Sequence, residues 1–299
     1  MVIRRARLLL VGLPLALAGP ARAAETCPAL FPDGQSPALT NPKLAARTVP
    51  LCFEAFAVLH SGVTRTPLYA AEHLTRDSVA AARTVARDDS FHEEDRLPPD
   101  DRASLEDYVR SGYDRGHLAP AGDMPTESAQ AQSFSLANIV PQDRSLNRGL
   151  WADIEESVRR LATRQGSVYV VTGVIFSGDD VQEIRGGVLV PTQLFKALYD
   201  PATGEAGAYL ARNGPDKDWR AVSIRELQAL SGIDPFPGLP PAARATAMTL
   251  PEPHAFVRGE AGRAGKETGK EPESWSDWLG RELARAVRKA LRDLLRSIF

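Results

Sequence analysis

The stretch Tyr113-Asp114-Arg115-Gly116-His117-Leu118-Ala119-Pro120-Ala121-Gly122-Asp123-Met124 places a carboxylate, a guanidinium and an imidazole within four residues. A histidine can take a proton from water near neutral pH, and an arginine offers a rigid fork of donors that suits a phosphate. Gly116 is expected to let the backbone bend, so that the side chains beside it point in different directions. The simpler alternative is a surface ion pair of Asp114 with Arg115 beside an ordinary histidine. Taken alone, these four residues favour that alternative.

Two polar motifs follow downstream, Asn138-Ile-Val-Pro-Gln142 and Asn147-Arg-Gly-Leu-Trp151. After the second motif, apolar residues recur at helical spacing: Ile154, Val158 and Leu161. The sequence therefore predicts a helix that begins close to Asn147, and a helix cap is the structural alternative for this asparagine. Glu155 and Arg159 lie four residues apart and share a face of the predicted helix, where a solvated ion pair is their simplest role.

Together these motifs resemble the DNA/RNA non-specific endonuclease family, the ββα-metal nucleases that include the endonuclease G type. Several ordered motifs at the expected spacing are far more specific than any one of them. The resemblance covers residues 48–240, and Val190–Lys196 is similar to a later core strand of the family. It implies an α+β domain with the ββα-metal nuclease fold, in which helices flank a central mixed, mostly antiparallel sheet.

The resemblance also implies a role for individual side chains. His117 matches the general base of the family, and Asn147 matches its one direct protein ligand to Mg²⁺, for which Mn²⁺ is a substitute. Glu155 matches the acidic residue that holds metal-bound water. Arg115 and Arg159 match arginines that bind phosphate.

The family has one more phosphate-binding arginine upstream, and both Arg83 and Arg87 are candidates for it. Asn138 matches a family asparagine close to the site. Elementary chemistry agrees with these roles, because phosphodiester hydrolysis needs an activated water, positive charge at the phosphate and help for the leaving oxygen. A hydrated Mg²⁺ held by one amide supplies charge but little base strength, so a neutral histidine is needed as well.

The N-terminus predicts export. Basic residues precede a short apolar run, Leu8–Ala18, and Ala21-Arg22-Ala23 has the small-x-small pattern of a cleavage site, so residues 1–23 are expected to be a signal peptide. The run is too short to span a bilayer, and no other segment is long and apolar enough. Cleavage would remove four arginines and no acid, which takes the net charge from −2 to −6. The expected location is therefore periplasmic or secreted.

Cys27 and Cys52 are the two cysteines of the chain. In an exported protein they are expected to form one disulfide that ties the N-terminal arm to the start of the domain. Two buried free thiols are the alternative.

Composition divides the remainder of the chain into four segments. Residues 24–47 are rich in turn formers and predict an arm, and residues 48–240 form the predicted nuclease domain, which begins with strands at 51–60 and 67–73. Residues 241–273 combine small, charged, Pro and Gly residues and predict a linker. Residues 274–299 predict a basic amphipathic helix, for which docking on the core is favoured over contact with nucleic acid or with a membrane surface.

The expected function is a Mg²⁺-dependent, sugar-non-specific endonuclease that acts on DNA and RNA and leaves 5′-phosphate ends. Two alternatives come from other classes: a nucleic-acid-binding module that has lost catalysis, and a delivery or interaction protein that acts through the C-terminal helix. The presence of His117, Asn147 and Glu155 together argues against the inactive module. Besides nucleic acid, a second copy of the chain and a cognate inhibitor are the expected partners.

Overall fold

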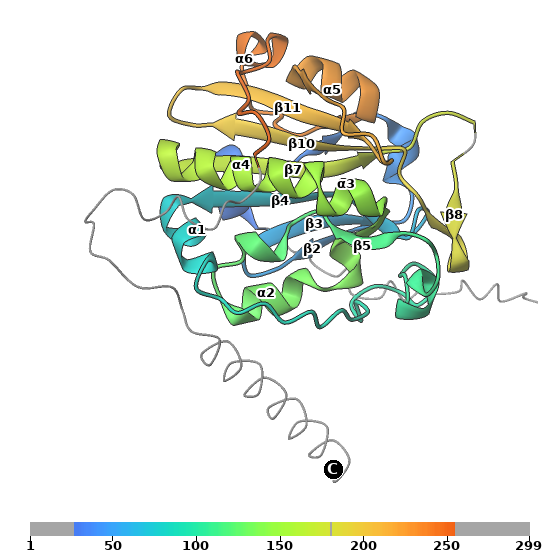
Figure 1. The fold of residues 1–299 in the computed structure, drawn as a ribbon. Coiled ribbons are helices and arrows are strands. Elements are labelled where there is room, and N and C mark those ends of the chain that lie inside the picture. Colours follow the sequence, from blue (N-terminus) through green and yellow to red (C-terminus); the bar gives the residue numbers. More distant parts are fainter. Residues whose placement is uncertain (1–26, 180, 255–299) are drawn as a thin grey trace, which may run out of the picture. The chain divides into compact units, whose positions relative to one another are not determined.

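The computed structural model describes residues 27–179 and 181–254, which belong to one compact unit (Figure 1). The predicted signal peptide, 1–23, and the predicted C-terminal helix, 274–299, lie outside the described residues. Among the residues that are described, no helix is both long and apolar enough to cross a membrane.

A seven-stranded sheet forms the centre of the fold, and every pair of neighbouring strands in it is antiparallel. In spatial order the strands are β12 (Trp219–Val222), β11 (Glu205–Arg212), β10 (Gln193–Asp200), β7 (Ser167–Ile175), β4 (Thr66–Thr75), β3 (Phe56–Ser61) and β2 (Thr48–Cys52). This arrangement confirms the predicted α+β class. The central sheet carries no parallel pair, where a mixed and mostly antiparallel one was expected.

One face of the sheet is covered by α4 (Leu150–Gln165) and α1 (Arg76–Ala82), which lie across β4 and β7 (Figure 1). The predicted apolar stripe of α4 is buried in full: Ile154, Val158 and Leu161. These side chains meet every second residue of the strands, because successive strand residues point to opposite faces. The same alternation directs Glu72, Thr172 and Lys196 towards α4.

The opposite face is covered by α5 (Ile224–Ser231) and by the N-terminal arm. The arm holds short elements: η1 (Pro28–Leu30), η2 (Pro32–Gly34), β1 (Ala38–Leu39) and η3 (Pro42–Ala45). Its strand β1 pairs with β13 (Ile233–Asp234), which directly follows α5. The arm and α5 therefore share one apolar core on this side of the sheet.

A smaller unit stands beside the central sheet. It is built from the antiparallel pair β5 (Asp114–His117) and β6 (Ile139–Gln142), followed by α3 (Arg144–Arg148) and then α4. The excursion between its two strands contains η5 (Ala121–Asp123), α2 (Glu127–Ser133) and η6 (Leu136–Asn138). Two more elements lie outside both sheets. One is η4 (Leu105–Tyr108), and the other is a hairpin in which β8 (Glu183–Ile184) and β9 (Val188–Leu189) are joined by η7 (Arg185–Gly187).

The domain continues beyond the predicted boundary at residue 240. Residues 241–245 form α6 (Pro241–Ala245), and the chain then returns along the sheet. Met248 and Leu250 are buried in the core beneath α4, and the Tyr209 hydroxyl donates to the carbonyl of Pro251 at 2.6 Å. The linker that the sequence predicts from residue 241 therefore does not begin before residue 255, because these apolar side chains close the core.

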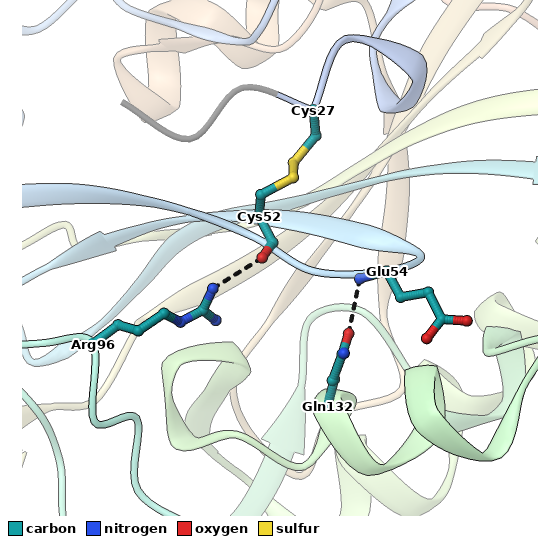
Figure 2. The surroundings of a disulfide bond; sticks show 5 residues. All are labelled: Cys27, Cys52, Glu54, Arg96 and Gln132. Atoms are coloured by element: carbon teal, nitrogen blue, oxygen red, sulfur yellow. Dashed lines mark hydrogen bonds between the residues drawn. A yellow bond between two sulfur atoms is a disulfide. The ribbon is translucent and has the colours of Figure 1, made fainter. Parts of the chain in front are cut away.

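The predicted disulfide between Cys27 and Cys52 is present, with 5.9 Å between the two Cα atoms. Figure 2 shows that it attaches the arm to the end of β2. The same strand end is held from the other side, because the Arg96 guanidinium donates to the Cys52 carbonyl at 2.9 Å and the Glu54 amide donates to Gln132 of α2 at 2.8 Å. The bridge thus secures a junction between the arm, the sheet and α2.

Reduction of this disulfide is expected to lower the free energy of unfolding by about 2–4 kcal/mol, because the unfolded chain gains freedom when the loop opens. Urea unfolding with and without reductant measures the change. A Cys27→Ser variant is the control, since its midpoint should not respond to reductant. Two thiols titrating in denatured, unreduced protein would contradict the bridge.

Candidate active site

An open cavity of about 630 Å³ lies beside β5, between α3, the start of α4 and the loop that follows α1. It is lined by polar, aromatic and aliphatic side chains: Arg87, Asp89, Phe91, Leu105, Tyr108, Val109, Tyr113, Asp114, Arg115, His117, Pro120, Ala121, Arg144, Asn147, Arg148, Ala152 and Glu155. The structure therefore gathers His117, Arg115, Asn147 and Glu155 around one space, although they are spread over about 40 residues of sequence.

His117 is the last residue of β5 and is 9% exposed. The rings of Phe91 and Phe134 flank the imidazole, at centroid distances of 5.4 and 4.9 Å. Its Nε2 atom has no hydrogen-bond partner among the described residues. Burial, helped by the charges of Arg87 and Arg115, lowers the pKa of His117 to about 3. The imidazole is therefore neutral at physiological pH and has a ring nitrogen free to take a proton.

Asn147 lies inside α3 and is not a helix cap. Asp143 caps α3 by accepting from the amides of Ser145 and Leu146, and Gly149 precedes α4. The Asn147 Nδ2 group instead donates to Asp114 at 3.2 Å. This bond commits the amide nitrogen and leaves the amide oxygen available as an acceptor at the cavity wall.

Asp114 links β5 to α3 through three side chains. Its carboxylate accepts from Arg148 Nε at 2.6 Å and from Arg144 Nε at 3.2 Å, in addition to Asn147. Burial opposes ionisation, yet these hydrogen bonds hold the pKa of Asp114 below its ordinary value. The simple alternative from the sequence, an ion pair with the adjacent Arg115, is not formed.

Two arginines are presented to the cavity near His117. The Arg115 guanidinium lies 4.1 Å from the centroid of the Phe91 ring, and Arg87 lies over Phe134 while bonding Asp89. The other candidate for the upstream arginine, Arg83, does not line the cavity and faces Glu156 at 3.7 Å. Of the two alternatives, the geometry favours Arg87.

Arg159 is placed differently from its predicted role. Its side chain is 14% exposed and does not line the cavity, and its guanidinium bonds Asp123 at 2.7 Å and Glu156 at 3.0 Å. The i,i+4 pair with Glu155 is also replaced by these contacts. We therefore assign Arg159 to the support of α4, whereas the exposed Arg144 and Arg148 are cavity residues that the sequence did not single out. Their signal was weak, because basic residues at a helix end are common.

Glu155 reaches the cavity from α4 and stands over the polar residues on the α4-facing side of the sheet. There Lys196 Nζ donates to Thr172 at 2.5 Å, and both oxygens of the fully buried Glu72 lack a partner among the described residues. Burial raises the pKa of Glu155 to about 7, against the opposing charges of Lys196 and Arg159. Burial and nearby Asp123 raise the pKa of Glu72 well above its ordinary value.

Asn138 does not reach the cavity. It is fully buried, and its Nδ2 donates to the carbonyls of Ala119 and Ser133 at 2.8 and 2.9 Å. Its Oδ1 accepts from the Ala119 amide at 3.0 Å. The side chain thus anchors the loop that directly follows His117, which is a positioning role.

Gly116 serves a close contact rather than a bend. A Cβ at this position would lie 2.1 Å from Oε1 of Gln142, the residue that opposes Asp114 across the strand pair. Any larger residue would therefore displace the side chain of Gln142.

The donor set fits one hydrated hard cation. No group of three His, Cys, Asp or Glu side chains that could hold a metal occurs in residues 27–179 and 181–254. Asn147 and Glu155 both line the cavity, and oxygen ligands with retained water suit Mg²⁺.

Because the folded-state pKa of Glu155 is raised, the wild type favours the protonated form and loses stability as pH rises from about 4.5 through about 7. Glu155→Gln lacks this loss. In metal-free buffer we expect the variant to gain about 1–2 kcal/mol over wild type between pH 5 and pH 8.

Urea unfolding at the two pH values, in EDTA, measures the gain. The exposed Glu205→Gln is the matched control and should show no such difference. An equal effect of Glu155→Gln at both pH values would contradict the buried carboxyl.

The chain is similar in sequence and in structure to known nucleases. The model of the DNA/RNA non-specific endonucleases matches residues 35–242. Nuclease C1 of Cunninghamella echinulata var. echinulata is 37% identical over 168 residues, which is 52% of this chain and 67% of that protein. Human mitochondrial nuclease EXOG is 32% identical over 212 residues, 63% of this chain and 57% of that protein.

Mitochondrial endonuclease G of Caenorhabditis elegans is 32% identical over 244 residues, or 75% of each chain. A chain in the crystal structure of the EndoG/EndoGI complex superposes with a TM-score of 0.61 and 26% identity, covering 66% of this chain and 89% of that one. The match to the family model spans the whole cavity and all seven strands of the central sheet. The chain therefore belongs to the DNA/RNA non-specific endonuclease family.

Proposed function

We propose that the protein is a secreted or periplasmic, Mg²⁺-dependent endonuclease that hydrolyses phosphodiester bonds of DNA and RNA and leaves 5′-phosphate ends. One observation carries the proposal: the neutral imidazole of His117 and the amide oxygen of Asn147 border the same cavity as Arg87 and Arg115. A base, a cation ligand and two counter-charges are what hydrolysis of a phosphodiester requires.

In this proposal Nε2 of His117 takes the proton from the attacking water. The low pKa of His117 keeps this nitrogen unprotonated before the reaction. The negative charges of the phosphate and of Asp89 favour the charged imidazolium once it forms. Arg87 and Arg115 offset the negative charge that builds on the phosphate. Asn147 would hold Mg²⁺ directly and Glu155 would hold water bound to the ion, which would supply positive charge beside the leaving 3′ oxygen.

Lack of base and sugar specificity is expected because contacts to the phosphate backbone carry no sequence information. The acidic net charge of the chain does not oppose this function, since a local basic cavity is enough to hold one phosphate.

Export is supported by the N-terminal pattern and by the disulfide, which persists best in an oxidising compartment. Several relatives are described as mitochondrial, and that location is theirs. A second copy of the chain and a cognate inhibitor remain predicted partners.

Purified protein is expected to cut plasmid DNA and RNA in Mg²⁺ and to stop in EDTA. His117→Ala should lower the rate by about 10²–10⁴-fold with little change in melting temperature, because the general base is lost while the fold remains. Gel assays on both substrates, with end-labelling to identify the 5′-phosphate, measure this. No cutting by wild type in Mg²⁺, or near-normal cutting by His117→Ala, would refute the proposal.

The link between Asp114 and Asn147 predicts the metal dependence. Asn147→Ala should raise the Mg²⁺ concentration for half-maximal activity sharply. Asp114→Asn should raise it by about 10–100-fold, since it releases the amide that orients the ligand. Metal titrations of both variants test this, with Asn41→Ala in the arm as the matched control. Unaltered Mg²⁺ dependence in Asn147→Ala would remove its role as a ligand.

A further inference from the structure

Part of the cavity lining is apolar and aromatic, and we call it the wall: Leu105, Val109, Tyr113 and Phe91. The Phe91 ring lies 5.4 Å from the imidazole of His117, centroid to centroid. Leu105 is 37% exposed and Val109 is 49% exposed. Four large hydrophobic side chains are exposed in the described part of the chain, and these are two of them, four residues apart and beside the same cavity.

This wall is held firmly in place. A capping box fixes η4, with the Ser104 amide donating to Asp107 at 2.7 Å, and Tyr108 points inward to donate to the carbonyl of Ile139 at 3.4 Å. Asp107 also packs against Gly186, which has a positive φ of 71° and no room for a Cβ. The exposure of Leu105 and Val109 is therefore a feature of a rigid platform and not of a loose loop.

The aromatic part of the wall is also positioned. Tyr113 donates its hydroxyl to Gln182 at 2.9 Å, and Phe91 is packed edge-on against Phe134 at 4.8 Å. The guanidinium of Arg115 lies on the Phe91 ring. Apolar surface and a phosphate-binding group therefore meet at one place, and a nucleotide presents this same combination of a flat apolar base and an anion.

We infer that the wall formed by Leu105, Val109, Tyr113 and Phe91 is a subsite for an unpaired nucleobase next to the scissile phosphate, so that the protein prefers single-stranded substrate. The inference rests on the proposed function. A phosphate held by Arg87 and Arg115 leaves the neighbouring base inside the same cavity. A paired base is stacked on both faces and cannot turn to the wall, whereas an unpaired base can.

The test uses oligonucleotides in which one linkage is a phosphodiester and all others are methylphosphonates. The base beside the cleavable linkage is thymine or is absent, and the thymine version is also offered as a duplex. The variant is Leu105→Ser combined with Val109→Ser, whose side chains are exposed. The matched control is Val63→Ser combined with Leu230→Ser, the other two exposed hydrophobic residues of the described chain.

We expect the wall variant to lower kcat/KM on the thymine single strand by about tenfold, because base contacts of this kind are worth that much, and to change the abasic strand by less than about twofold. The control variant should match wild type on every substrate. Equal losses on the thymine and abasic strands, or no loss on either, would overturn the subsite.

A binding measurement separates this inference from the proposed function. A single strand carrying 2-aminopurine is titrated with protein in Ca²⁺, and its fluorescence is expected to rise as the base leaves its neighbours. The rise should be reduced in the wall variant even if no preparation cuts nucleic acid. A fluorescence change that is the same in wild type and variant, together with a change of oligomeric state in the variant, would assign the wall to a second copy of the chain and overturn the inference.

Discussion

The carboxylate of Asp114 accepts hydrogen bonds from Asn147, Arg144 and Arg148, and this contact joins the strand that carries His117 to the helix that carries Asn147, the proposed metal ligand. The strand β5 pairs with β6 alone and stands outside the seven-stranded sheet. The two arginines balance the charge, and the amide of Asn147 is turned so that its oxygen is free. A single half-buried carboxylate thus determines both the distance and the orientation of the parts.

The polar residues beneath Glu155 are expected to lower the free energy of unfolding. Lys196, Thr172 and Glu72 lie among mostly apolar side chains on that face of the sheet. Glu72 has no hydrogen-bond partner among the described residues, which is costly for a buried ionisable group. Burial raises the pKa of Glu155 to about 7, while the charges of Lys196 and Arg159 oppose the shift. Arg159 limits the cost by joining Asp123 to Glu156. Carboxyl groups with a shifted pKa are typical of catalytic and binding sites.

The sequence motifs predicted the residues around the cavity better than they predicted their contacts. The helical period identified α4, which brings Glu155 to the cavity. Asn147 lines the same cavity from the separate short helix α3. The partner of Arg159 is Asp123, 36 residues upstream, and no local pattern points to it. The apolar wall of η4 was missed for the same reason.

Local signals also failed where the chain lacks strong turn residues. The stretch from 51 to 60 was expected as one strand, but β2 ends at Cys52 and β3 starts at Phe56, with a tight turn that contains neither Gly nor Pro. The segment after residue 240 is rich in proline and charged residues, so a linker was predicted there. Met248 and Leu250 are nevertheless buried, because they pack on a surface that only the folded sheet provides.

The central claim is that one amide oxygen, oriented by Asp114, is the protein's direct ligand for the cation. A crystal soaked in Mn²⁺ tests it through the anomalous signal of the metal. The account predicts one peak in the cavity, about 2.1–2.2 Å from the Oδ1 atom of Asn147, with no carboxylate oxygen in direct contact. A peak bound directly by the carboxylates of Glu155 or Asp114, with Asn147 outside ligand distance, would contradict it.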